Sequence, residues 1–136
     1  MKKLSIRSYA YIGDAVYEVF ARKKTLFITE NPKRLHKATS SIVNAEFQTE
    51  LLEFIQDFLV EEEKELARRA RNLSVTTARR TNHTLHRLST AFEALIGYLY
   101  LNNQDRLKDL YNYIEPLIDK KLLNSSLPSG QGTNLS

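Results

Sequence analysis

The chain has 136 residues, a length suited to one domain with a single hydrophobic core. Because it contains no cysteine, disulfide bonds, thiolate metal sites and a cysteine nucleophile are excluded. The net charge of +4 permits a polyanionic partner, and without a long apolar run or an apolar leader segment we expect a soluble, cytoplasmic protein that does not enter a membrane.

An all-helical fold is predicted, because the chain has only four glycines and three prolines and no sustained alternation of apolar and polar residues. The first helix is expected over residues 5–27, with Gly13 as a place where it could break. The pair Asn31-Pro32 is typical of a helix start, with Asn as the N-cap and Pro in the first helical position. A short helix should follow, ending near Lys37.

The middle of the chain predicts two further helices. Ser40 or Ser41 is expected to cap a helix whose apolar residues over 47–58 repeat at spacings of three and four and face the core. Another helix should run from Glu61 to near Asn72, since acids in its first turn and arginines in its last turn complement the helix dipole. Residues 73–82, rich in Thr and Ser, are predicted to form an exposed loop.

The last third predicts a helix over residues 83–101 and a final amphipathic helix after Asn102-Asn103. Pro116 should kink or interrupt that final helix. Residues 1–123 are therefore expected to form the domain, and the polar, turn-rich residues 124–136 a disordered tail.

Two acidic residues stand alone in apolar helical segments. Asp14 is the only charged residue in 8–17, and Glu93 is the only one in 89–101. Each could be a helix cap or be neutralised by an arginine, because an unpaired buried carboxylate is costly. Alternatively, the two helices pack together and both carboxylates hold one Mg²⁺, which prefers hard oxygen ligands. Glu18, one turn after Asp14, could supply a third ligand or pair with Arg22 at i+4.

Two glycines, Gly13 and Gly97, lie beside these acids. A glycine inside a helix costs about 1 kcal/mol relative to alanine. Two of them in apolar helices therefore predict a close approach of helix backbones, although they are poor evidence of function by themselves.

Positive charge is concentrated in one segment. Between Glu65 and Glu93 there is no acid, while six arginines fall there: Arg68, Arg69, Arg71, Arg79, Arg80 and Arg87. Since arginine binds phosphate oxygens through two parallel hydrogen bonds, this segment is a candidate RNA-binding surface. A second basic stretch could contact another part of the RNA backbone: Lys23, Lys24, Lys33, Arg34 and Lys37. A solvated helix end followed by a charged loop is the alternative.

The stretches YIGDAVYE (residues 11–18) and FEALIG (residues 92–97) resemble the two signature helices of the ribonuclease III catalytic domain. From about residue 4 to 118 the chain is similar to the Mini-III ribonucleases, which consist of that catalytic domain alone. The motifs PKRLHK (32–37), RRARN (68–72) and STAFE (89–93) share in this resemblance.

The resemblance implies a homodimeric, magnesium-dependent endoribonuclease with the ribonuclease III catalytic-domain fold. Such an enzyme would cleave double-stranded RNA and mature the 5′ and 3′ ends of precursor 23S ribosomal RNA, a step of ribosome biogenesis. Asp14 and Glu93 match the catalytic Asp and Glu of the two motifs. Ala10 and Thr90 stand where full-length ribonuclease III has two further acids, a departure that favours Mini-III. A catalytically silent RNA-binding module of the same fold is the alternative.

Overall fold

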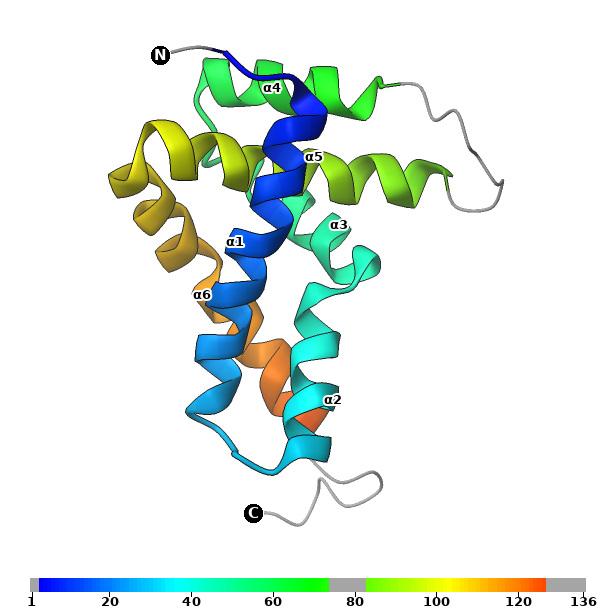
Figure 1. Cartoon of the computed structure of the whole chain (residues 1–136), viewed down its shortest axis with the longest axis vertical. Helices are drawn as coiled ribbons and strands as arrows, with labels where there is room; N and C mark the ends of the chain where they lie inside the picture. Colours follow the sequence, from blue (N-terminus) through cyan, green and yellow to red (C-terminus); the bar gives the residue numbers. More distant parts are fainter. Residues whose placement is uncertain (1–2, 74–82, 127–136) are drawn as a thin grey trace.

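The computed structural model describes residues 3–73 and 83–126, and every regular element in these ranges is a helix (Figure 1). The predicted all-helical fold is confirmed. The helices are α1 (Ile6–Leu26), α2 (Pro32–Val43), α3 (Ala45–Phe54), α4 (Glu61–Arg71), α5 (His83–Asn102) and α6 (Gln104–Ser126). None of the helices described is both long and apolar enough to cross a membrane.

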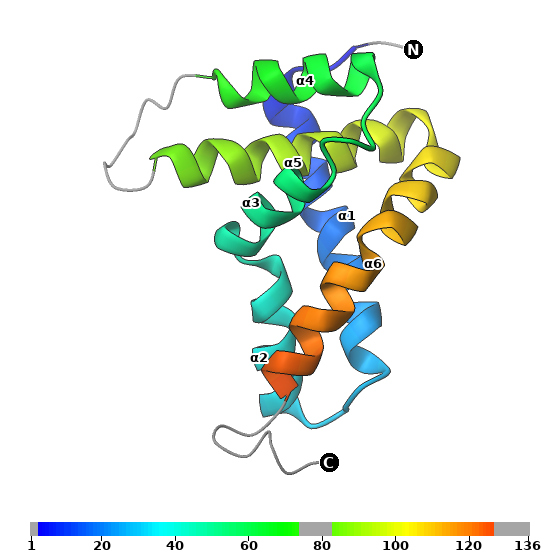
Figure 2. The same cartoon turned by 180° about the vertical axis from the view of Figure 1, so that it is seen from behind.

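Helix α5 is the centre of the upper half of the molecule, where it packs against α1, α3 and α4. Helix α1 crosses α5 and continues downward, and there α2 packs against both α1 and α6 (Figures 1 and 2). The fully buried large side chains come from α1, α2, α5, α6 and the segment of α3 with the turn after it: Tyr17, Ile42, Phe47, Leu51, Ile55, Phe92, Leu95, Ile96, Leu99, Leu110, Ile114 and Ile118.

Helix α1 begins where the sequence predicted it. The Ser5 side chain accepts a hydrogen bond from the Ser8 amide at 3.1 Å, which caps the first turn. The helix continues through Gly13, so the break considered at that residue is wrong. Gly13 is buried against α5, and this packing outweighs the low helix propensity of glycine.

The boundary between α2 and α3 differs from the prediction. Asn31 caps α2 as expected, but the helix does not end near Lys37 and runs on through Ser40 and Ser41, so neither serine is a cap. Inside the helix, the Ser41 hydroxyl donates to a carbonyl of the preceding turn at 2.7 Å. Asn44 caps α3 instead, because its side-chain oxygen accepts a hydrogen bond from the Phe47 amide at 2.8 Å.

Helix α4 has the predicted bounds and starts at a buried ion pair. Glu63 is only 4% exposed and accepts hydrogen bonds from Arg106 Nε and Nη2, each at 2.8 Å, and from the Val60 amide at 3.0 Å. Burial alone would raise the pKa of Glu63, but the bonds from Arg106 and Val60 bring it below its ordinary value. Arg106 Nη2 also donates to the Phe58 carbonyl at 2.8 Å, so the start of α6 is fastened to the start of α4.

Helix α6 continues without interruption through Pro116 to Ser126. The predicted interruption is therefore wrong, and α6 extends three residues into the segment that the sequence analysis assigned to the tail. Ile114 and Ile118, on either side of the proline, are fully buried and keep both parts of the helix packed on the core. The rest of the predicted loop, residues 74–82, and of the predicted tail, residues 127–136, lies outside the described residues.

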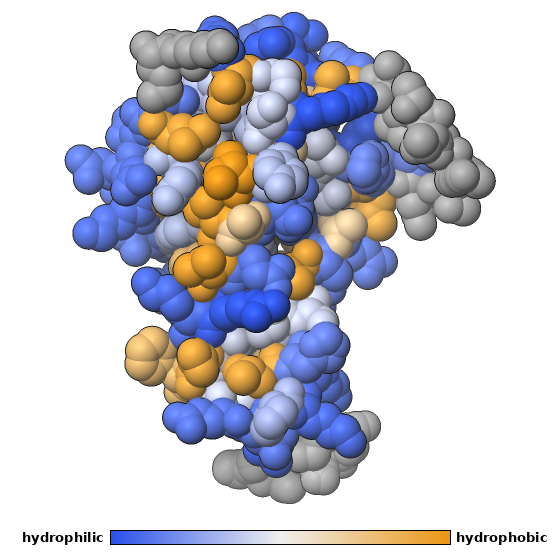
Figure 3. Space-filling view, viewed as in Figure 1, coloured by the Kyte–Doolittle hydropathy of each residue, from blue (hydrophilic) through white to orange (hydrophobic). Residues whose placement is uncertain are grey.

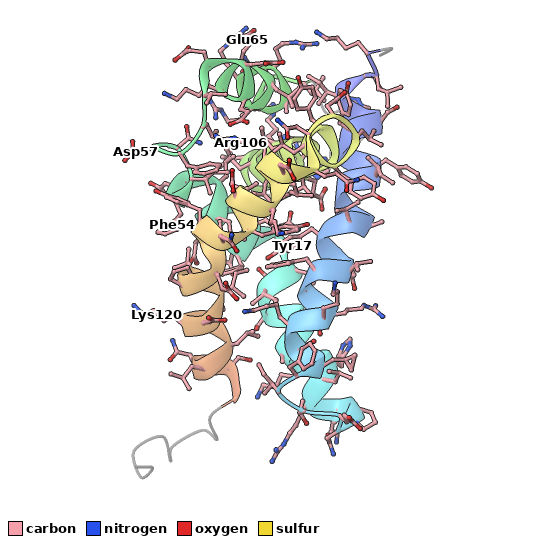
Figure 4. All side chains as sticks on the ribbon, turned by 90° about the vertical axis from the view of Figure 1, so that its left-hand side faces the viewer. Tyr17, Phe54, Asp57, Glu65, Arg106 and Lys120 are labelled. Carbon is pink, nitrogen blue, oxygen red and sulfur yellow. The ribbon has the colours of Figure 1, made fainter. Side chains whose placement is uncertain are left out.

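Two contacts join the lower helices to α1. The Tyr17 hydroxyl points into the interior and donates to the Ile42 carbonyl of α2 at 2.7 Å (Figure 4). The Lys24 ammonium group lies 2.6 Å from Glu115 and 2.9 Å from Asp119, both on α6. These contacts fix the direction in which α1 leaves its crossing with α5.

Candidate active site

Helices α1 and α5 cross with their backbones in contact at the two predicted glycines. A Cβ atom built on Gly13 would lie 1.8 Å from the Glu93 carbonyl oxygen, and one built on Gly97 would lie 1.9 Å from the Tyr9 carbonyl oxygen. No other residue type fits at either position without separating the helices. The predicted close approach is confirmed, and it brings Asp14, the neighbour of Gly13, up to the side chain of Glu93.

The Asp14 and Glu93 carboxyl groups meet at this crossing and share a hydrogen bond. Burial, the negative charge of Asp14 and that hydrogen bond raise the pKa of Glu93 to about 8. Within the described residues, neither acid forms an ion pair with a lysine or arginine. The alternative of an arginine partner is therefore wrong for the described residues. The Asp14–Glu93 pair carries negative charge that no lysine or arginine of the described residues offsets.

Glu18 does not join this pair. Its carboxylate accepts hydrogen bonds from Arg22 Nε at 3.0 Å and Nη2 at 2.9 Å, which is the i,i+4 pairing weighed against a ligand role. No cluster of three His, Cys, Asp or Glu residues suited to a metal ion occurs in 3–73 and 83–126. Asp14 and Glu93 thus stand as two carboxylates without a third.

Gln48 of α3 is a member of the site that sequence reasoning missed. Its side chain is 2% exposed and donates a hydrogen bond to the Glu93 carboxylate, which opposes the rise in the pKa of Glu93. The same amide nitrogen lies 3.2 Å from the Val43 carbonyl oxygen. The available signal was its place in an apolar repeat, because Leu51 and Leu52 follow at i+3 and i+4 and are buried.

Comparison with known proteins assigns the chain to a family. The model of the ribonuclease III domain matches residues 7–104. The chain belongs to the ribonuclease III domain family. The ribonuclease is 40% identical to the Mini-ribonuclease 3 of Gloeobacter violaceus over 79% of each chain, and 41% identical to that of a Thermoanaerobacter species over 82% of this chain and 80% of the relative. It is therefore an endoribonuclease of the Mini-III group.

A solved structure supports the same fold. An X-ray structure of a protein from Fusobacterium nucleatum superposes on the ribonuclease with a TM-score of 0.76, at 30% sequence identity, covering 88% of this chain and 96% of the other. The helical arrangement built from α1 to α6 is therefore that of the ribonuclease III domain family, as the sequence predicted.

The basic residues of α2 lie on the surface of the ribonuclease. Lys33, Arg34 and Lys37 are all exposed. Among the described residues, none of their side chains forms a hydrogen bond or an ion pair; the Arg34 backbone amide donates to the Asn31 cap at 3.0 Å. Their side chains are thus available to a polyanion.

The predicted arginine surface is only partly placed. Arg68 and Arg69 are exposed on α4, and Arg68 pairs with Glu65 at 2.7 Å. Arg71 and Arg87 are partly buried, and among the described residues no partner accepts a hydrogen bond from the buried Arg87 Nε. Along α5, Arg87 precedes Glu93 by about 9 Å of helix axis. Outside the described residues lie Arg79 and Arg80.

Proposed function

We propose that the ribonuclease cleaves double-stranded RNA with Mg²⁺ held by Asp14 and Glu93, and that it matures the 5′ and 3′ ends of precursor 23S ribosomal RNA. The observation that carries the catalytic part is the meeting of these two carboxylates at the α1–α5 crossing without a neutralising cation from the described residues. The resemblance of the sequence to the Mini-III ribonucleases supports the ribosomal substrate.

The donor set fits magnesium. Mg²⁺ keeps several of its waters and is usually bound by one or two carboxylates together with substrate phosphate, so a pair without a third acid is sufficient. Burial and the charge of Asp14 raise the pKa of Glu93, so a second negative charge is costly in the metal-free pair, and a divalent cation would offset that cost. When bound there, the cation would lower the pKa of a coordinated water and offset charge on the phosphate group.

The chain's own groups have separate tasks in this proposal. Asp14 is exposed and lies at the surface that a phosphodiester can reach, whereas Glu93 is partly buried behind it. Glu93 would hold the cation in its ionised form, its proton released to solvent, so both acids would present carboxylate oxygens.

The exposed basic residues supply contacts to the RNA backbone. Lys33, Arg34 and Lys37 on α2, together with Arg69 on α4, are free to approach phosphate oxygens. A-form RNA is recognised mainly through its shape, phosphates and 2′-hydroxyls. Such a surface needs no aromatic stacking platform, and sequence preference should be weak.

A homodimer is supported by an apolar strip along α1. Val19 and Phe27 are 59% and 90% exposed, and hydrophobic side chains gather along this helix on the face shown in Figure 3. Val19 and Phe27 line a groove of about 550 Å³ between α1 and the α5–α6 corner, together with Phe20 and Tyr111 among others. Exposed apolar surface of this kind marks an interaction site, and a two-fold dimer would place one active site on each strand of a duplex.

The catalytic proposal is tested by cleavage of a duplex RNA in Mg²⁺ or EDTA. Asp14→Asn should lose cleavage while keeping its helical spectrum and its affinity for the duplex, because only a ligand of the cation is removed. Glu18→Gln is the matched control, since this acid lies one turn further along α1 and pairs with Arg22; it should cleave normally. Near-normal cleavage by Asp14→Asn would contradict the proposal that Asp14 is a catalytic metal ligand.

The RNA surface is tested by salt dependence. Replacing Arg34 and Lys37 with alanine should weaken duplex binding and reduce the slope of log K against log salt by about 1 for each lost phosphate contact. Lys120→Ala is the control, because the side chain of this exposed lysine projects from the side of α6 that faces away from α1 and α2 (Figure 4). An unchanged slope for the double variant would take α2 out of the interface.

A further inference from the structure

Gln48 is a polar side chain in a position built for an apolar one. It belongs to the inward face of α3, where Phe47, Leu51 and Leu52 are also buried. A buried amide without partners is costly, and an apolar residue of the same length would extend the hydrophobic face at no such cost. The presence of glutamine here therefore calls for a role that depends on its amide.

The Gln48 amide bridges two groups that need a donor. One N–H points to the Val43 carbonyl, 3.2 Å away at the end of α2, where helix carbonyls lack intrahelical partners. The amide also donates to the Glu93 carboxylate. Since α3 packs on α5 and Asn44 caps α3 at its first turn, the amide is held in place relative to Glu93.

We propose that Gln48 is a positioning residue for Glu93, which it orients for binding a divalent cation together with Asp14. A carboxylate has about four acceptor sites on its two oxygens. A donor fixed on one of them leaves the others to face Asp14, whereas an unrestrained carboxylate would have to be ordered when the cation binds. This inference rests on the metal site proposed above.

The effect expected is a loss of cation affinity. Removing a hydrogen-bond partner of a metal ligand typically costs about 10- to 100-fold in metal affinity or activity. Gln48→Met keeps the length of the side chain and removes the donor. It should weaken the binding of Mn²⁺, measured without RNA from the electron paramagnetic resonance signal of the free ion, by about tenfold or more. The Mg²⁺ concentration for half-maximal cleavage should rise by a similar factor.

Gln56→Met is the matched control. Gln56 lies in the turn after α3 and its amide donates to the Leu52 carbonyl at 2.9 Å, so this variant also removes a glutamine bond to a backbone carbonyl. It should leave both Mn²⁺ affinity and the Mg²⁺ requirement unchanged. If Gln48→Met lowers the urea midpoint but binds Mn²⁺ as the wild type does, Gln48 only supports the fold and the inference is overturned.

A measurement on the unmodified protein covers the case in which Gln48→Met does not fold. The side-chain amide resonances of Gln48 should shift when Mg²⁺ is added to ¹⁵N-labelled ribonuclease, while those of Gln56 should not. Absence of a shift at Gln48 with a demonstrably bound cation would also overturn the inference. Asp14→Asn separates the two proposals. Normal Mn²⁺ affinity in Asp14→Asn would contradict the metal site itself. Lost Mn²⁺ affinity in Asp14→Asn, with normal affinity in Gln48→Met, would contradict only the role of Gln48.

Discussion

Replacing Glu93 with glutamine should have two effects: it should abolish cleavage, and it should stabilise the metal-free ribonuclease against unfolding. Burial and the charge of Asp14 raise the pKa of Glu93 from 4.5 to about 8, so the protonated form is favoured in the folded state. Protonated Glu93 therefore contributes to the free energy of unfolding. The contribution is complete below the pKa of the unfolded chain, 4.5, and is lost as the pH rises through the folded-state pKa of about 8. At about 1.4 kcal/mol for each tenfold change in proton affinity, the upper bound is about 5 kcal/mol, which partial exposure to water should reduce to about 2 or 3 kcal/mol.

The assay is urea unfolding of both proteins in EDTA at pH 5, 7 and 9. Glutamine has the shape of the protonated acid and does not titrate, so the difference should be small at pH 5 and grow by at most about 1.4 kcal/mol per pH unit up to pH 8. Added Mg²⁺ should then stabilise the wild type alone. Glu18→Gln, which removes an exposed ion pair, should show no such gain. A Glu93→Gln variant no more stable than wild type at pH 9 would refute the reasoning.

Three further substitutions test the architecture by urea unfolding. Gly97→Ala should destabilise by about 3 kcal/mol, because its Cβ would lie 1.9 Å from the Tyr9 carbonyl oxygen; the stabilisation of about 1 kcal/mol expected from helix propensity alone would contradict the close crossing. Arg106→Met should cost about 3 kcal/mol by leaving Glu63 buried without its partner, and a neutral result would show that Glu63 regains water. Tyr17→Phe should cost about 1 kcal/mol through the orphaned α2 carbonyl, and an unchanged midpoint would mean that this carbonyl finds another donor.

The convergence of Asp14 and Glu93 could be predicted because single charges are conspicuous in apolar helices. The two glycines carried the complementary information, since a residue with low helix propensity inside a helix indicates a packing requirement. The two acids and the two glycines together predicted that these helices pack side by side and that their backbones approach closely. The role of the two acids in holding a cation remains a prediction, as do the cytoplasmic location and the RNA contacts of the arginines.

Contacts between distant segments could not be predicted in the same way. Ser40, Ser41 and Asn44 are all good N-caps by residue type, and the packing of α2 against α1 and α6 decides among them. Glu63 stands in a run of acids, so nothing in the local sequence distinguishes the one that is buried against Arg106. Both choices depend on tertiary structure, which residue type alone does not determine.

The burial of α5 also has a consequence for hydrogen exchange. Every residue from Ala94 to Gly97 is buried, so amide protons in this part of the helix should exchange only when the whole domain unfolds. The end of α6 is held by the more exposed bridges from Lys24 to Glu115 and Asp119, and its amides should exchange through local opening. The carboxylate on α5 is therefore attached to the slowest-exchanging segment, and fraying of the C-terminal helix should leave it in place.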